Sequence, residues 1–161
     1  TGTDVGSAMG LIVNSIDLHF QRFVRDGKVA IPAGIRSAGV PRPKLVEAYY
    51  GEYSTHLLLT SLDAYQDYFS GKGFNNKNGP SLLSYLENLE QQVLAERIHS
   101  NFEKLVSDTQ QLSDPLSQQI ETDNDPVIQV FLDMQDLITI FKADMASVMG
   151  ISITNQDNDG D

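Results

Sequence analysis

The chain has 161 residues, of which 40% are hydrophobic and 20% are charged, with 11 lysines and arginines against 22 aspartates and glutamates. This composition excludes a disordered or collagen-like chain, and the length suffices for one domain with its own core. No apolar run of about 18 residues occurs, so the sequence predicts no transmembrane helix. Cysteine is absent, which excludes disulfides, thiolate metal ligands and a cysteine nucleophile.

Charge is distributed unevenly along the chain. Residues 1–46 contain six basic and three acidic side chains, whereas residues 47–161 contain five basic and 19 acidic ones. Because the whole chain carries a net charge of −11, it would repel a nucleic-acid backbone, and nucleic acid is not an expected partner. The basic side chains of the first part could hold an anion, or they could pair with acids of the same chain. They are Arg22, Arg25, Lys28, Arg36, Arg42 and Lys44.

Apolar residues spaced by four and three predict a first helix over residues 4–26, with Gly27 as its stop. The stripe consists of Val5, Met9, Ile12, Ile16, Phe20 and Phe23. Residues 28–46 contain three prolines and two glycines, and they carry four of the six basic residues of this first part of the chain. They predict a long irregular loop, and such loops usually serve a function or wrap between elements.

The rest of the chain also has helical periodicity. Ser54 is the expected N-cap of the next helix, and Gly150 is the expected stop of the last. The predicted segments are 54–70, 81–86, 90–112, 115–121 and 126–149. Only residues 151–154 alternate as a strand would. Together these elements predict an all-α domain over residues 1–161, an antiparallel four-helix bundle with a long irregular loop after the first helix.

Histidine and acidic residues offer two weak metal motifs. Glu96 and His99 have the Glu-x-x-His spacing of bundle di-metal sites, but those sites use two copies of the motif and this chain has one. Asp157 and Asp159 belong to a C-terminal segment that matches the first six positions of a calcium loop. The alternative for that segment is an acidic tail. Iron, zinc and calcium stay open as metals, and no residue of this chain is expected to be catalytic.

Three motifs carry a family resemblance. They are residues 25–37 (RDGKVAIPAGIRS), 46–54 (VEAYYGEYS) and 149–161 (MGISITNQDNDGD). In order and spacing they resemble the C-terminal half of the imelysin family, a group of bacterial periplasmic or surface proteins. The resemblance covers essentially the whole chain. The best-known family motif, Gly-x-His-x-x-Glu, belongs to the first half and is absent here.

The resemblance implies a function and a location. Imelysin-like proteins have two helical halves, were named for a proposed metallopeptidase activity, and are linked to iron uptake. We therefore expect the C-terminal bundle of a bacterial envelope protein, in the periplasm or held at the outer membrane by an upstream lipoprotein anchor. Its expected partners are the N-terminal half and iron or an iron-uptake component. One alternative is part of a metal-dependent peptidase whose His-x-x-Glu ligands lie upstream. Another is an acidic interaction or cation-binding module.

The resemblance also implies where an interdomain cleft would lie. The loop after the first helix would face the other half, and arginines there would recognise an anion or carboxylate while acids orient them. The alternative is that the acids only pair with these arginines to hold the loop on the bundle. The expected cleft residues are Arg25, Asp26, Lys28, Arg36, Ser37, Glu47 and Tyr49.

Overall fold

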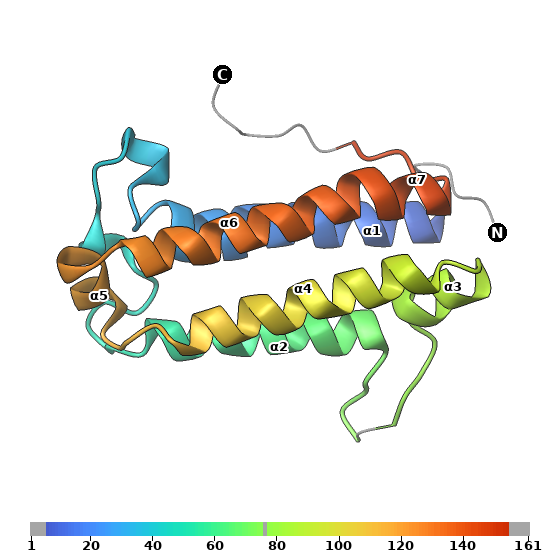
Figure 1. Ribbon diagram of the computed structural model, residues 1–161, viewed down its shortest axis with the longest axis horizontal. Coiled ribbons are helices and arrows are strands. Elements are labelled where there is room, and N and C mark those ends of the chain that lie inside the picture. Colours follow the sequence, from blue (N-terminus) through green and yellow to red (C-terminus); the bar gives the residue numbers. More distant parts are fainter. Residues whose placement is uncertain (1–5, 76, 155–161) are drawn as a thin grey trace.

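The computed structural model describes residues 6–75 and 77–154, and within these ranges it is all-helical with no strand (Figure 1). The first long rod is α1 (Ala8–His19) followed without a break by the π-helix η1 (Phe20–Ala30). It packs through η1 on α6 (Asp125–Thr139). In turn α6 packs on α4 (Gln92–Gln110), and α4 packs on α2 (Ser54–Ser70). The prediction of an all-α chain is confirmed.

The first helix differs from its prediction at the C-terminal end. It runs through Gly27 to Ala30, and the predicted stop at Gly27 is wrong. Glycine ends a helix where the backbone needs a positive φ, and Gly27 is not among the glycines with positive φ. The irregular loop therefore begins at residue 31 instead of 28. The predicted start, with Asp4 and Val5, lies outside the described residues.

The apolar stripe of the first helix is also displaced from its predicted position. Ile12 is 41% exposed and Phe23 is 61% exposed, although both were expected in the core. Phe20 of the predicted stripe is buried as expected, but beside it the buried face contains Val13 and Val24, which the stripe did not include. When a helix has apolar residues on more than one side, its sequence does not determine which side is buried. The packing of the neighbouring helices determines it.

The other helices lie close to their predicted segments. A positive φ of 75° at Gly71 ends α2, and Ser81 caps α3 (Leu82–Asn88) by accepting a 2.9 Å hydrogen bond from the Ser84 amide. The short α5 (Leu116–Thr122) precedes α6. The last rod continues from α6 through the π-helix η4 (Ile140–Met145) and α7 (Ala146–Met149) to Gly150. The predicted N-cap role of Ser54 is wrong, because Ser54 Oγ accepts from the Ala48 amide of the preceding loop.

Three phenylalanines form the centre of the core. Phe69 of α2, Phe102 of α4 and Phe141 of η4 have ring centroids 6.0 to 6.2 Å apart, within the range of favourable aromatic contacts. The long helices α2 and α4 bury further apolar side chains that have no exposed surface, among them Leu58, Leu62, Ile98 and Leu105.

Residues 151–154 form no strand, contrary to their alternation. Asn14 of α1 holds this segment instead: its amide donates to the Ser152 carbonyl at 3.1 Å and its oxygen accepts from the Thr154 amide at 2.8 Å. A helix side chain thus takes the place that a neighbouring strand would occupy, because no strand lies beside this segment in the part of the chain that the structure describes.

The loop 31–53 has two single turns of 3₁₀-helix, η2 (Ile35–Ser37) and η3 (Pro43–Leu45). Two backbone segments of the loop approach closely at Gly34, which has a φ of 90° and would place a Cβ 2.5 Å from the Val40 carbonyl carbon. The Arg42 amide closes this part of the loop with a 2.8 Å bond to the Pro32 carbonyl. The fold of the loop therefore depends on a glycine at position 34.

Replacement of Gly34 by alanine should destabilise the protein by about 2–4 kcal/mol, because a positive-φ cost adds to a backbone clash. Gly39 is the matched control, since its φ is 80° but nothing lies within 4 Å of its Cβ position. Gly39→Ala should cost only about 1–2 kcal/mol. Urea unfolding followed by circular dichroism measures both, and equal losses would contradict the importance of the contact with Val40.

Candidate functional site

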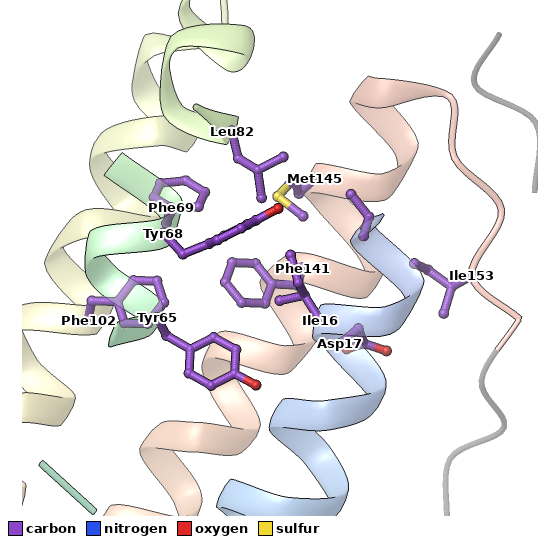
Figure 2. A pocket seen from close by; sticks show the side chains of 11 residues that line it. Ile16, Asp17, Tyr65, Tyr68, Phe69, Leu82, Phe102, Phe141, Met145 and Ile153 are labelled. Atoms are coloured by element: carbon purple, nitrogen blue, oxygen red, sulfur yellow. The ribbon is translucent and has the colours of Figure 1, made fainter. Parts of the chain in front are cut away.

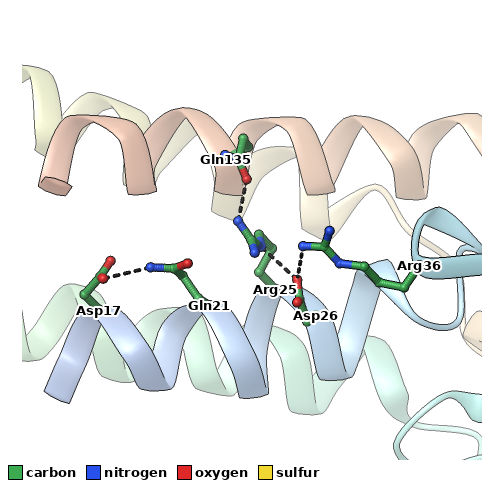
Figure 3. Close-up of polar contacts among 6 residues, drawn as sticks. All are labelled: Asp17, Gln21, Arg25, Asp26, Arg36 and Gln135. Atoms are coloured by element: carbon green, nitrogen blue, oxygen red, sulfur yellow. Dashed lines mark hydrogen bonds and ion pairs between the residues drawn. The ribbon is translucent and has the colours of Figure 1, made fainter. Parts of the chain in front are cut away.

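The most unusual side chain of the molecule is Arg25, which is 1% exposed and is the largest fully buried residue among those described. Its Nε donates to Asp26 Oδ1 at 2.8 Å, and a guanidinium nitrogen donates to Gln135 Oε1 of α6 at 2.5 Å (Figure 3). The guanidinium carbon also lies 5.7 Å from the ring centre of Phe131. A buried charge survives only with such partners, because desolvation of an unpaired guanidinium costs several kcal/mol.

Asp26 joins this arginine to the loop. The same Oδ1 atom accepts a 3.1 Å bond from Arg36 of η2, so one carboxylate bridges two arginines from two elements. Lys28 and Glu47 make a second ion pair between η1 and the far part of the loop. We call these five residues the charged clamp: Arg25, Asp26, Lys28, Arg36 and Glu47.

Arg25 and Asp26 are consecutive residues of the π-helix η1, and both are buried. The buried positions of η1 come in three runs, which are residues 20–21, 24–26 and 29–30. Neighbouring residues are also buried together in the α-helices of this chain, as Val13 and Asn14 are in α1. The run at 24–26 places Asp26 where both Arg25 and Arg36 reach its carboxylate.

The structure brings five of the seven predicted cleft residues into the charged clamp and leaves two outside it. Ser37 Oγ donates to the Val40 carbonyl at 2.7 Å within its own turn. The Tyr49 ring meets Tyr50 edge to face, with centroids 5.1 Å apart. Both therefore shape the loop itself and do not join the buried charges.

The charged clamp holds the loop in place. Arg25 has almost no exposed surface that could contact a ligand, and Asp26 Oδ1 accepts bonds from two arginines, Arg25 and Arg36. A further bond, from the Asn124 side chain to the Ala33 carbonyl at 2.8 Å, attaches the start of the loop to the N-terminus of α6. These contacts match the alternative in which acids pair with the arginines to hold the loop. The basic side chains left exposed on the loop are Arg42 and Lys44.

The Glu96–His99 motif does not form part of a metal-binding group among the described residues. Glu96 is exposed on α4, and His99 lies 3.3 Å from Glu103 one turn further along the same helix. Within residues 6–75 and 77–154, no three His, Asp or Glu side chains converge in a group that could hold a metal ion. Asp157 and Asp159 lie outside the described residues.

A second ion cluster was missed by sequence reasoning. Lys104 of α4 donates to Asp133 of α6 at 2.5 Å and to Asp108 at 2.9 Å. These bonds raise the pKa of Lys104, and the bond from Lys104 lowers the pKa of Asp108. The only signal in the sequence is the i,i+4 spacing of Lys104 and Asp108, which reveals nothing about α6. The cluster ties α4 to α6, and the Lys104 ammonium group is occupied by these two carboxylates.

A hollow opens between α1 and α2 beside the aromatic core (Figure 2). Its walls are almost entirely apolar, with Ile16 and Asp17 from α1 and Tyr65 and Tyr68 from α2. The accessible volume of this cavity is only about 20 Å³, which is space for roughly one water molecule. An organic ligand would have to move a side chain to enter.

Tyr65 closes the side of this hollow. Its hydroxyl bonds His19 Nδ1 at 2.5 Å, and its ring meets Phe20 edge to face with centroids 4.9 Å apart. Burial, helped by the nearby Asp17 carboxylate, raises the pKa of Tyr65 far above its usual value of 10. Tyr65 therefore keeps its proton and can donate a hydrogen bond to His19 Nδ1, which points to a structural role at the seam between α1 and α2.

Comparisons with protein-family models, with curated proteins and with solved structures find no match for this chain. The family resemblance accordingly stays a prediction based on the sequence motifs.

Replacement of Arg25 by methionine should destabilise the protein by about 3–5 kcal/mol, because it leaves Asp26 buried without its main partner. Arg42→Met is the control on the exposed part of the loop and should change stability by less than about 0.5 kcal/mol. Thermal and urea unfolding measure the difference. A loss below about 1 kcal/mol for Arg25→Met would show that the buried pair contributes little.

The raised pKa of Tyr65 predicts a specific loss of stability in alkali. The unfolded tyrosine ionises near pH 10, while the folded one still holds its proton, so its contribution is complete below pH 10 and declines as the pH rises towards the folded value. The free energy of unfolding should therefore fall more steeply above pH 10 in the wild type than in Tyr65→Phe. Parallel curves for the two proteins would contradict the shift.

Proposed function

We propose that the helices form an antiparallel four-helix bundle that serves as the C-terminal half of an imelysin-like envelope protein. In this proposal the bundle contributes one wall of an interdomain site used in iron uptake. The three sequence motifs support the family, and the order α1–η1, α2, α4 and α6 of long, mutually packed helices supports the bundle. Among the described residues, no helix has the length and apolar character to span a membrane.

One observation carries the proposal: the loop 31–53 is tightly held, yet it exposes large apolar side chains. Tyr50 is 97% exposed, and Ile31, Val40, Leu45 and Tyr53 are between 38% and 60% exposed. Scattered exposed apolar residues are ordinary, but this many on one loop is typical of a surface that another protein covers. Tyrosines are also enriched at the centres of interfaces.

The charged clamp gives this surface its shape in advance. Ion pairs from η1 to both halves of the loop restrict the loop before any partner arrives. A surface that is already ordered loses less entropy on binding, so more of the contact energy appears as affinity. The clamp residues Arg25, Asp26 and Arg36 act here as positioning residues for the wall.

Arg42 and Lys44 give the wall a positive rim on an otherwise acidic chain. A cationic rim attracts carboxylates, either on an acidic surface of the partner half or on an iron-chelating ligand. Metal ligands would come from the partner half, where the family motif Gly-x-His-x-x-Glu belongs. No specific observation favours the peptidase or cation-module alternatives.

The test begins with the gene. We expect the reading frame that contains this chain to encode a second helical half with a His-x-x-Glu motif. In the full protein, the two halves separated by limited proteolysis should stay associated. The double variant Leu45→Ser and Tyr50→Ser should weaken that association by about tenfold or more.

Val93 of α4 supplies the control, because it is 81% exposed and lies away from the loop. Val93→Ser should leave the association unchanged. A reading frame without a second helical half would overturn the proposal, and so would loop variants that associate as well as the wild type. Titration of the full protein with iron tests the positive rim. If the iron ligand is anionic, Arg42→Met should lower the affinity for it.

A further inference from the structure

The outer face of α1 carries a coiled-coil pattern that the described helices leave unused. Ala8, Leu11, Ser15 and Leu18 are spaced by three, four and three, as the a and d positions of a heptad are. Leu11 is 56% exposed, Ala8 and Ser15 are exposed, and Leu18 is half-buried. The face that α1 turns to the core contains different residues, namely Gly10, Val13, Asn14 and Asp17. We call the four outer residues the α1 seam.

The sizes along the α1 seam alternate in a way that suits a reversed copy of itself. When two identical helices pair antiparallel about a two-fold axis, residues whose numbers add to 26 lie opposite each other. Leu11 then faces Ser15 of the second copy, and Leu18 faces Ala8 of the second copy. Every layer thus contains one leucine and one small residue, which is the arrangement that fills space evenly. Parallel pairing would instead stack leucine on leucine and small on small.

Charge also selects this face for a second copy. Each chain has a net charge of −11, so two copies repel each other wherever acidic surfaces meet. Between Ala8 and His19 the only acidic or basic residue besides the terminal histidine is Asp17, and Asp17 is buried. The α1 seam is therefore a face on which two copies can approach without opposing like charges at the contact.

The neighbouring surface continues the apolar contact. A shallow groove beside the α1 seam is lined by Ser15, Ile16 and His19 of α1 and by Ala64, Tyr65 and Tyr68 of α2. Tyr68 is 48% exposed and stands at its rim. Side chains that flank the seam of a second copy would lie against this groove, and aromatic groups of this kind often contribute most to an interface.

We propose that the α1 seam is an interaction surface for a second copy of this chain, paired antiparallel through α1 about a two-fold axis. This proposal is independent of the interdomain wall on the loop 31–53, which lies at the other end of the η1 rod. It assigns Leu11 and Ser15 to the same layer of the contact.

Sedimentation velocity over a range of concentrations tests the pairing. The wild type should form a dimer, and its association constant should rise between about 20 and 300 mM salt because the repulsion between the two acidic chains is screened. Leu11→Ser and Ser15→Leu should each weaken the dimer by about tenfold, because each makes its layer too small or too large. The double variant exchanges the two sizes and should restore the constant to within about threefold of the wild type.

Val93→Ser on α4 is the control variant and should dimerise as the wild type does, while circular dichroism confirms that each variant is folded. Sedimentation at the monomer mass at every concentration would overturn the proposal and leave another protein as the occupant of the face. Failure of the double variant to recover would overturn the antiparallel layer, even if the single variants weaken the dimer.

Cysteine cross-linking gives a second measurement that does not depend on variant stability. The natural chain contains no cysteine, so a mixture of Leu11→Cys and Ser15→Cys chains can form disulfides only at the introduced positions. Mild oxidation should give mainly the mixed dimer, because residues 11 and 15 face each other across the axis. A mixture of Val93→Cys and Ser15→Cys chains should cross-link much more slowly. Equal rates for the two mixtures would overturn the assignment.

Discussion

The burial of one positive charge, that of Arg25, is the constraint on which the rest of the structure depends. A guanidinium without water needs a carboxylate and further acceptors within reach, and no single helix supplies them all. Asp26 provides the carboxylate from the next position, and Gln135 provides an acceptor from α6. Satisfying this charge therefore fixes the pairing of the first and last rods and draws Arg36, with the loop, onto the helix.

The π-helix η1 carries this charge, and its residues Val24, Arg25 and Asp26 are buried in succession. The buried charge lies next to the point where the helical core meets the long loop. The outcome is a loop whose inner side is held by ion pairs and whose outer side carries exposed tyrosines and aliphatic groups. Order on one side and exposed apolar surface on the other are the features that support an interdomain wall.

Apolar patterning in this molecule does more than form the core. The first helix has apolar residues on several sides, and only one side faces the core of the chain. Ile16 borders the groove beside α2, and the α1 seam faces outward. Apolar residues on several sides are expected in a helix that contacts more than one neighbour, because each contact needs its own apolar stripe. The same reasoning separates α4, whose single stripe is fully buried, from α1.

The sequence by itself determined the helical class, the segments of the later helices, and the residues that would cluster near the loop. Single apolar stripes and glycine stops are local signals, and the segments of α2 and α4 and the stop at Gly150 obeyed them, whereas the predicted cap at Ser54 did not. Only the tertiary structure decided the continuation through Gly27, the buried side of α1 and the role of Arg25. Those features depend on α6, which lies about a hundred residues away in the chain. The contact between a buried charge and an acceptor far away in the chain produces no periodic pattern in the sequence. It depends on how the helices pack and not on the spacing of residues along one helix.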